Sequence, residues 1–408
     1  MLINWLNKKY YLFNRSDFMK IRLIICYVLF MHLAPLYAQK DSALIAELVN
    51  DIAAAQVKQP GAYFQGMFPA YRACEGYPHN YQPDNNIFFT AITAFTLKDL
   101  SHYLNPQDAA KALQIIKNAV PAYRYYRNPN GKPFYSFWPA GARILPHSYF
   151  INRYNGILAQ GDDADDSVMI LLASDNNDSD NTALKERLVQ VSNLKKRRIN
   201  ATFKKYRNIP AYSTYLGEKM HPDFDFSVQC NILYFNLEKK LPPVQQDSAT
   251  IFLLAEIVKN REYMKRPVYI SPCYAKPAVQ LYHITRLMHA FKIDQLELYK
   301  KQLISDAYRL LAKATNIMDR IILRTALIRL GAEVPDLTIN TISDFEKTDQ
   351  EDFVFFQARA AFAQPTPLKQ IFLHWNYLIY SFYCTAYNKA LWLEYLVLKN
   401  QQHGQAKR

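Results

Sequence analysis

Glycine is scarce in this chain, making up only 10 of its 408 residues, whereas soluble proteins use about 7%. Tight β-hairpins depend on glycine at turn positions with positive φ. The shortage therefore argues against a fold built mainly from hairpins and favours helices.

Several familiar catalytic signatures are missing as well. The sequence has no G-x-S-x-G, no H-E-x-x-H, no P-loop and no G-x-G-x-x-G, so the common hydrolase, zincin and nucleotide-binding motifs give no lead. Cysteine is sparse too. Four cysteines follow residue 38, with no C-x-x-C pair; they are Cys74, Cys230, Cys273 and Cys384. They form one or two disulfides or remain buried thiols, and the sequence leaves both alternatives open.

Apolar runs long enough to span a bilayer are absent after the first 38 residues. Before that point, Lys20 and Arg22 precede an apolar run over 23–36, and Ala38 stands at a suitable cleavage site. This layout predicts a signal peptide within 1–38, with translation starting at Met19. We therefore expect a periplasmic or secreted protein with no stable membrane span after cleavage. An uncleaved N-terminal anchor is the alternative.

The charge is strongly basic, with a formal value of +14. Residues 1–38 hold five basic and one acidic residue, which leaves 44 basic against 34 acidic residues, a net charge of +10. Such charge suits polyanions, but export leads us to expect no nucleic-acid partner. The densest basic stretch, 195–205, is interpreted as a solvated face.

Helical periodicity predicts one domain over 39–408. Six segments are apolar nearly all round, as buried helices are; they span 87–97, 167–173, 227–235, 275–288, 320–330 and 384–398. Between them lie segments with one apolar stripe, typical of outer helices; they span 42–56, 107–124, 181–191, 247–259 and 295–314. The alternation predicts an all-α fold, an α/α toroid of about six inner and six outer helices.

Two long aromatic-rich stretches, 61–86 and 128–162, each precede a predicted inner helix. Irregular segments of this length in a compact domain are usually lids or binding loops, so we expect both at one mouth of the toroid. The substrate-binding candidates are the large or charged side chains in them: Arg72, Tyr135, Trp138, Arg143 and His147.

Two predicted inner helices start with the same acidic pattern, D-x-D-x-S. One is Asp163-Ala-Asp165-Asp166-Ser167 and the other is Asp223-Phe-Asp225-Phe-Ser227. One interpretation is pure N-capping, since carboxylates favour the positive end of a helix. The other is a catalytic cluster, because crowded carboxyl groups push one another's pKa values apart so that one can act as an acid. No metal ligand set or cofactor is predicted, although a divalent cation at this cluster would also relieve the repulsion.

The string Asp163-x-Asp165-Asp166-Ser167 resembles the D-x-D-D-T motif of class II terpenoid cyclases. The repeated inner helices resemble the α/α toroid that those enzymes share with protein prenyltransferases, and segments such as LYHITRLM and ALIRLG are similar in character. The resemblance implies that Asp165 is the acid that protonates an alkene or an epoxide.

Two other classes of function remain open. A carbohydrate-active α/α barrel, a hydrolase or lyase, would use Asp165 or Asp166 with Asp225 as its carboxyl pair and aromatic residues as sugar platforms. A non-catalytic ligand-binding or scaffold protein would have its centre filled by side chains and its aspartates engaged in capping. The expected ligand is a small molecule or a glycan.

Overall fold

The computed structural model describes residues 41–139, 161–195, 197–217, 222–337, 339, 341–347, 353–359 and 368–405. The chain divides into two units, Met1–Glu47 and Leu48–Arg408. In the first unit the described residues are 41–47, which are helical; the predicted signal peptide lies outside them. The second unit begins with helical residues 48–55 and holds every element discussed below.

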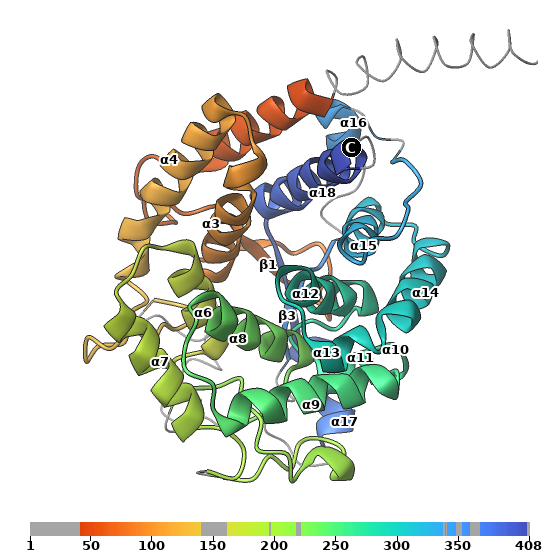
Figure 1. Cartoon of the computed structure of the whole chain (residues 1–408). Helices are drawn as coiled ribbons and strands as arrows, with labels where there is room; N and C mark the ends of the chain where they lie inside the picture. Colours follow the sequence, from red (N-terminus) through yellow and green to blue (C-terminus); the bar gives the residue numbers. More distant parts are fainter. Residues whose placement is uncertain are drawn as a thin grey trace, which may run out of the picture. The chain divides into compact units, whose positions relative to one another are not determined.

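Helices of the second unit that are buried nearly all round pack in a closed cycle, each against the next and the last against the first (Figure 1). In cyclic order they are α3 (Phe88–Leu100), α6 (Ala164–Ala173), α8 (Phe226–Glu238), α12 (Pro277–Ala290), α15 (Ile317–Arg329) and α18 (Thr385–Gln405). Each corresponds to one of the six predicted apolar segments, so the mostly helical fold predicted from the sequence is confirmed.

Amphipathic helices lie outside this cycle and cover its members. The pairs are α4 (Pro106–Tyr123) on α3, α7 (Asp178–Gln190) on α6, α9 (Gln245–Lys259) on α8 and α14 (Lys300–Leu311) on α15. The single outer helix expected over 295–314 is two helices, α13 (Asp294–Glu297) and α14, because the chain turns at the exposed Leu298. Short helices connect the remaining parts: α10 (Glu262–Lys265), α11 (Pro267–Ile270) and α16 (Ile342–Lys347).

A small sheet is the main difference from the all-α prediction. It has four antiparallel strands in the order β2 (Gln82–Pro83), β1 (Tyr71–Cys74), β4 (Ile379–Tyr383) and β3 (Phe356–Arg359). Strand β1 comes from the first predicted loop and β4 leads directly into α18. Three 3₁₀ turns, Ser101–Tyr103, Lys204–Tyr206 and Asn376–Leu378, and helix α17 (Leu368–Phe372) complete the described elements.

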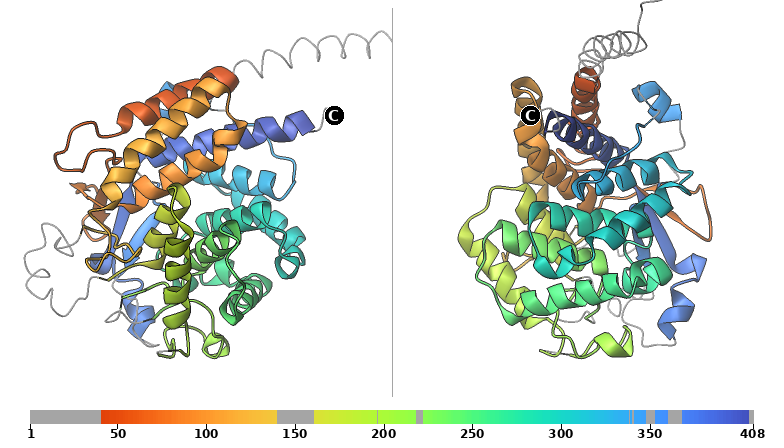
Figure 2. Two further views of the ribbon diagram at one scale, coloured as in Figure 1. Left: turned by 60° about the vertical axis from the view of Figure 1, so that its left-hand side comes forward. Right: turned by 45° about the vertical axis from the view of Figure 1, so that its right-hand side comes forward.

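The sheet lies at the end of the cycle where α3, α6 and α8 begin (Figure 2). Phe356 of β3 packs against Phe88, the first residue of α3, with ring centroids 5.0 Å apart. The adjacent Phe355 packs against Tyr387 in the first turn of α18, with ring centroids 4.8 Å apart. Aromatic side chains from the sheet therefore fill this end of the cycle.

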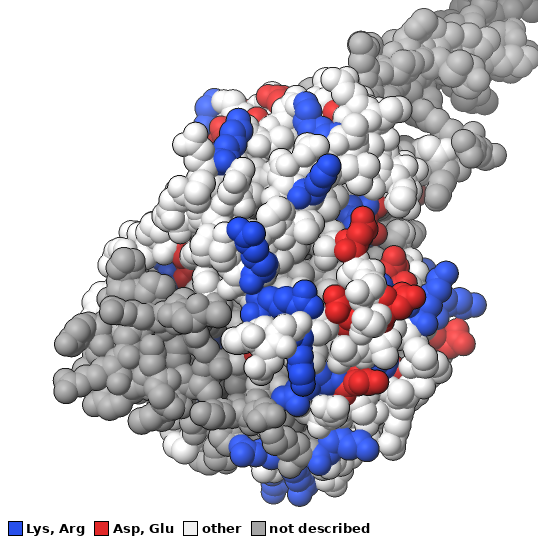
Figure 3. Space-filling model, turned by 90° about the vertical axis from the view of Figure 1, so that its left-hand side faces the viewer, with Lys and Arg blue, Asp and Glu red and all other residues white. Residues whose placement is uncertain are grey.

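The outer surface carries charges of both signs. On the face drawn in Figure 3, Lys and Arg side chains form a band beside a group of Asp and Glu side chains. Within the stretch expected to be a solvated face, Lys205 pairs with Glu262 at 2.9 Å and stays 44% exposed. Across the described residues, no helix is both long and apolar enough to cross a membrane.

Candidate acidic site

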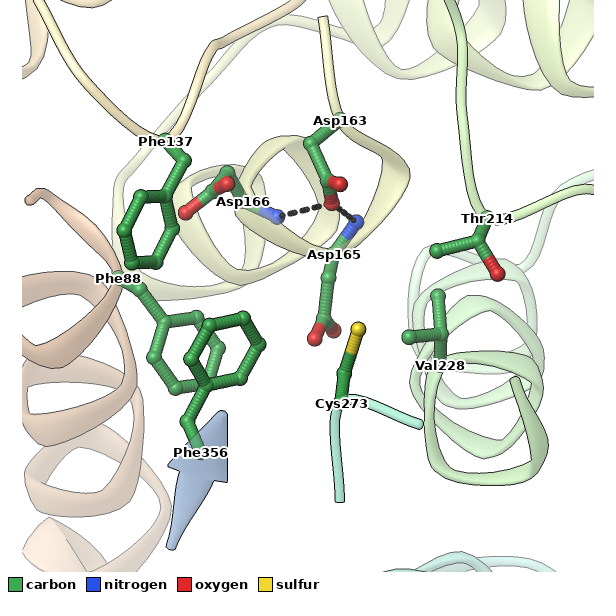
Figure 4. Close-up of a pocket in the computed structure, with 9 residues that line it drawn as sticks. All are labelled: Phe88, Phe137, Asp163, Asp165, Asp166, Thr214, Val228, Cys273 and Phe356. Carbon is green, nitrogen blue, oxygen red and sulfur yellow. Dashed lines mark hydrogen bonds between the residues drawn. The ribbon is translucent and has the colours of Figure 1, made fainter. Parts of the chain in front are cut away.

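The starts of the inner helices meet at a small cavity beneath the sheet (Figure 4). It is lined by Phe88, Phe137, Asp163, Asp165, Asp166, Thr214, Val228, Cys273 and Phe356. These residues come from the starts of α3, α6 and α8, from β3, and from three connecting segments: Phe137 between α4 and α6, Thr214 between α7 and α8, and Cys273 before α12. The cavity volume is about 20 Å³, which is room for roughly one water molecule.

Asp163 is the N-cap of α6. Its Oδ1 accepts hydrogen bonds from the backbone N–H groups of Asp165, at 2.7 Å, and Asp166, at 3.4 Å. Its backbone is held between two neighbouring segments by bridges to Tyr135 and Tyr215. Burial, and then the charge of Asp165, raise the pKa of Asp163, and these effects outweigh the two N–H donors. Capping therefore explains the position of the Asp163 carboxyl group. Its raised pKa means that this group still binds a proton more readily than an exposed aspartate does.

Asp165 is buried and accepts hydrogen bonds at both carboxylate oxygens. The side-chain amide of Asn231 in α8 donates to Oδ1 at 2.6 Å, and the hydroxyl of Tyr274 donates to Oδ2. Burial raises the pKa of Asp165, while these two donors and the charge of Arg286 oppose the rise.

Asp166 lies beside Asp165 in the first turn of α6 and is only 1% exposed. Within the described part of the chain, its Oδ1 has no hydrogen-bond partner. Burial, and then the charges of Asp163 and Asp165, raise the pKa of Asp166 well above its ordinary value, and no lowering contact accompanies them. A buried oxygen without a partner is costly, so Asp166 is the carboxyl group that the fold leaves uncompensated.

The start of α8 uses the same sequence pattern in a different register. Asp225 is its N-cap and accepts from the N–H groups of Ser227, at 3.0 Å, and Val228, at 3.3 Å. It also accepts from the Ser271 hydroxyl at 2.5 Å and the Cys273 N–H at 2.9 Å. Burial raises the pKa of Asp225 to about 6, against the lowering effect of these donors.

Asp223 has a different partner from the cavity carboxylates. Its carboxylate forms an ion pair with Lys369 of α17 at 3.2 Å, and both side chains are almost completely buried. Lys369 also donates to the carbonyl of Ala201 at 2.7 Å. The pair ties α17 to the start of α8 and gives Asp223 a structural explanation.

Among the described residues, none of Asp163, Asp165, Asp166 and Asp225 forms an ion pair with a lysine, arginine or histidine. No three His, Cys, Asp or Glu side chains in that part of the chain are arranged to hold a metal ion.

The predicted binding residues divide into three groups. Arg72 and Trp138 both contact the buried Asp84: Arg72 pairs with it at 2.8 Å, and the indole Nε1–H of Trp138 lies 3.1 Å from each carboxylate oxygen. They brace β1 and the second loop next to the cavity. The backbone N–H of Tyr135 donates to the Ser167 hydroxyl at 2.9 Å, so Tyr135 anchors the α6 start. Arg143 and His147 lie outside the described residues.

Sequence reasoning missed a polar network inside the cycle. Asn231 accepts at its Oδ1 from Arg286 Nη2 at 2.6 Å and lies 3.0 Å from His283 Nδ1. Arg286 and His283 are both buried on α12. The available signal was the run of polar residues within otherwise apolar helices, such as Asn231 in SVQCNILYF, since a polar residue at a buried position needs a partner.

The four cysteines in the described part of the chain are free thiols; Cys230 and Cys384 are buried, whereas Cys74 and Cys273 are half-buried. Cys273 lines the cavity opposite Asp165 (Figure 4). Burial and the nearby carboxylates, Asp225 first, raise the pKa of Cys273 well above its ordinary value, so it is a neutral thiol there and a poor nucleophile.

Comparison with known proteins adds no assignment: no family model, no curated protein and no solved structure matches this chain.

Proposed function

We propose that the second unit is an α/α toroid whose acidic mouth transfers a proton to a small, largely apolar ligand, as in the terpenoid cyclases that the sequence resembles. The observation that carries the proposal is the group of three carboxyl groups that line the cavity, Asp163, Asp165 and Asp166, with no ion-paired cation among the described residues. Exported location and the absence of a nucleic-acid partner belong to the same proposal.

The toroid is supported by the closed cycle of helix contacts and by the four outer helices that cover it. In such a ring, parallel inner helices place their N-termini at one end. The helix dipoles then add positive potential at the mouth and make a cluster of acidic side chains tolerable there.

The proposed chemistry follows from burial. A carboxyl group that stays protonated near neutral pH can donate its proton when an acceptor arrives. Phe88, Phe137 and Phe356 form the facing wall, which keeps water away and offers aromatic faces to a developing positive charge.

The size of the cavity sets a condition on binding. A volume of about 20 Å³ holds about one water molecule, so a larger ligand must displace side chains. Phe356 and Phe137 stack on each other with ring centroids 5.2 Å apart. They close the cavity on the sheet side, and we expect them to move when a ligand enters.

The test combines ligand screening with Asp165→Asn, Asp166→Asn and Asp225→Asn. Each variant should retain the helical circular dichroism spectrum, and turnover or ligand binding found for the wild type should fall at least tenfold in one or more of them. If every variant folds and none changes a detected activity or affinity, the aspartates are structural.

A scaffold without catalysis is the second candidate, favoured by the aromatic side chains that fill the ring. Tyr274, for example, packs against Phe356 and Phe355 with ring centroids 5.5 and 5.7 Å apart. This candidate predicts that Phe356→Ala destabilises the protein and opens no binding site for apolar probes. The carbohydrate-active alternative has less support, because the aromatic side chains among the described residues that line the cavity are phenylalanines.

A further inference from the structure

We propose that Asp166, and not Asp165, is the proton donor of this site. Asn231 and Arg286 are positioning residues that keep Asp165 ionised, so that its carboxylate is the counter-charge of the protonated ligand. This inference rests on the proposed proton-transfer function and departs from the role that the family resemblance gives to Asp165. The two carboxyl groups differ in their hydrogen bonds: both oxygens of Asp165 accept one, whereas Oδ1 of Asp166 accepts none from the described residues.

The first step concerns the orientation of the Asn231 amide. An arginine guanidinium can only donate hydrogen bonds. Because Arg286 Nη2 lies 2.6 Å from one terminal atom of the amide, that atom must be the carbonyl oxygen. The amide nitrogen therefore points at Asp165 Oδ1, 2.6 Å away, and Arg286 fixes Asn231 as a donor.

The second step concerns the proton on Asp165. Its Oδ1 must accept from Asn231, and its Oδ2 accepts from the hydroxyl of Tyr274. Burial, and then the charge of the same carboxylate, raise the pKa of the Tyr274 phenol well above its ordinary value, so the phenol keeps its proton and can donate it in a hydrogen bond. Hydrogen bonds donated to both oxygens favour the ionised form of Asp165 over the protonated form.

The third step concerns Asp166, whose Oδ1 has no hydrogen-bond partner in the described part of the chain. The titratable groups that act on it are Asp163 and Asp165 from its own helix start, with Tyr126 nearby after α4 and Cys273 across the cavity. The two carboxyl groups are acidic neighbours, and none of the four brings positive charge. Burial and the two neighbouring carboxyl groups oppose a negative charge on Asp166, so a proton there is retained longest as pH rises.

The proposed proton transfer starts from protonated Asp166 and a neutral ligand. The O–H bond of Asp166 breaks, its electron pair stays on the carboxylate, and the proton forms a new bond to the acceptor atom of a neutral ligand, which becomes cationic. When the product gives up a proton, either the Asp165 carboxylate or the newly formed Asp166 carboxylate can take it. Exchange with solvent restores both groups.

The test is an infrared titration of the full chain that follows the C=O stretch of protonated carboxyl groups from mildly acidic to alkaline pH. Asp166→Asn should remove the component that persists to the highest pH, and Asp165→Asn should leave that component in place. Asp306→Asn is the matched control: this buried carboxylate of α14 pairs with Arg261 and Arg309, and its loss should leave the component unchanged. An Asp165→Asn effect equal to or larger than that of Asp166→Asn overturns the proposal.

Tyr274→Phe provides a second, independent measurement. Tyr274→Phe removes one donor from the ionised Asp165. At a pH where the wild type shows only the persistent component, the variant should therefore show an additional protonated carboxyl group. Arg286→Gln should act in the same direction. No change in either variant means that Asp165 was protonated already and contradicts the assignment. A protein with no protonated carboxyl group near neutral pH would instead overturn the proposed function itself, so the two failures can be told apart.

Discussion

The starts of α6 and α8 have the same sequence pattern and use it differently. In α6 the first aspartate of D-x-D-x-S, Asp163, is the N-cap; in α8 the second, Asp225, takes that place. Because of this shift of two residues, Asp165 and Asp166 lie inside the first turn of α6. Asp223 lies before α8 and forms an ion pair with Lys369. One start is therefore fully paired and the other keeps an uncompensated carboxyl group. A repeated motif predicts a repeated helix start, but the function of each residue depends on which position becomes the cap.

The largest expected effect is at the paired start. Lys369→Met keeps the length of the side chain and leaves Asp223 buried without its ion pair, so we expect a loss of about 3 to 5 kcal/mol in the free energy of unfolding. Urea denaturation measures it. Lys205→Met is the control at an exposed pair and should cost less than about 1 kcal/mol. If Lys369→Met and Lys205→Met lowered the free energy of unfolding equally, the buried pair at the start of α8 would be no more important for stability than an exposed one.

The pH dependence of stability is next. Because the pKa of Asp225 rises from 3.8 unfolded to about 6 folded, the folded state holds this proton more tightly. The contribution of protonated Asp225 to the free energy of unfolding is complete below about pH 4. It is lost as the pH rises through the folded pKa of about 6. The shift corresponds to about 3 kcal/mol.

Denaturation of wild type and Asp225→Asn across that window tests the prediction. Asparagine can still cap the helix, and the loss of the Cys273 contact should lower stability evenly at every pH. The variant should therefore show a shallower decline with pH. Parallel curves for the two proteins would contradict it.

Capping by Asp163 should have a smaller effect. Asp163→Ala removes the acceptor of two backbone N–H groups and should cost about 1 to 2 kcal/mol. Asp163→Asn, which keeps a capping side chain, should cost much less. If asparagine were as damaging as alanine, the role of Asp163 would lie in its charge and not in its cap.

The smallest expected effect has the opposite sign. Asp166→Asn removes a buried acid that has an unpartnered oxygen, so we expect the protein to gain about 1 kcal/mol, and more at alkaline pH where the wild-type group is forced to ionise. Thermal melts at two pH values measure it. Destabilisation at both would place Asp166 among the structural aspartates.

Much of the helical framework could be predicted because each inner helix is apolar on all sides. The segment IFFTAITAFTL, for instance, has no polar face and must be surrounded by protein. The sheet could not be predicted. Strands such as FQAR and IYSFY are short, and β1 pairs with β4 from the far end of the chain, so the stabilising contacts are not local.

The candidate site was predicted only in part. The pattern D-x-D-x-S located two helix starts, but it did not reveal the shift in the capping position. Asn231, Tyr274 and Arg286 act on Asp165 from other helices and segments, and a single sequence does not show which inward polar residues meet across a ring. Their partners depend on tertiary packing.

The pairing of β1 with β4 and the closure of α18 onto α3 also set the order of assembly. The cycle of helices cannot close until α18 has been synthesised, and contacts between such distant segments slow folding. If the protein is exported as we propose, this delay keeps the chain unfolded during translocation, and the acidic cavity is completed only at its destination.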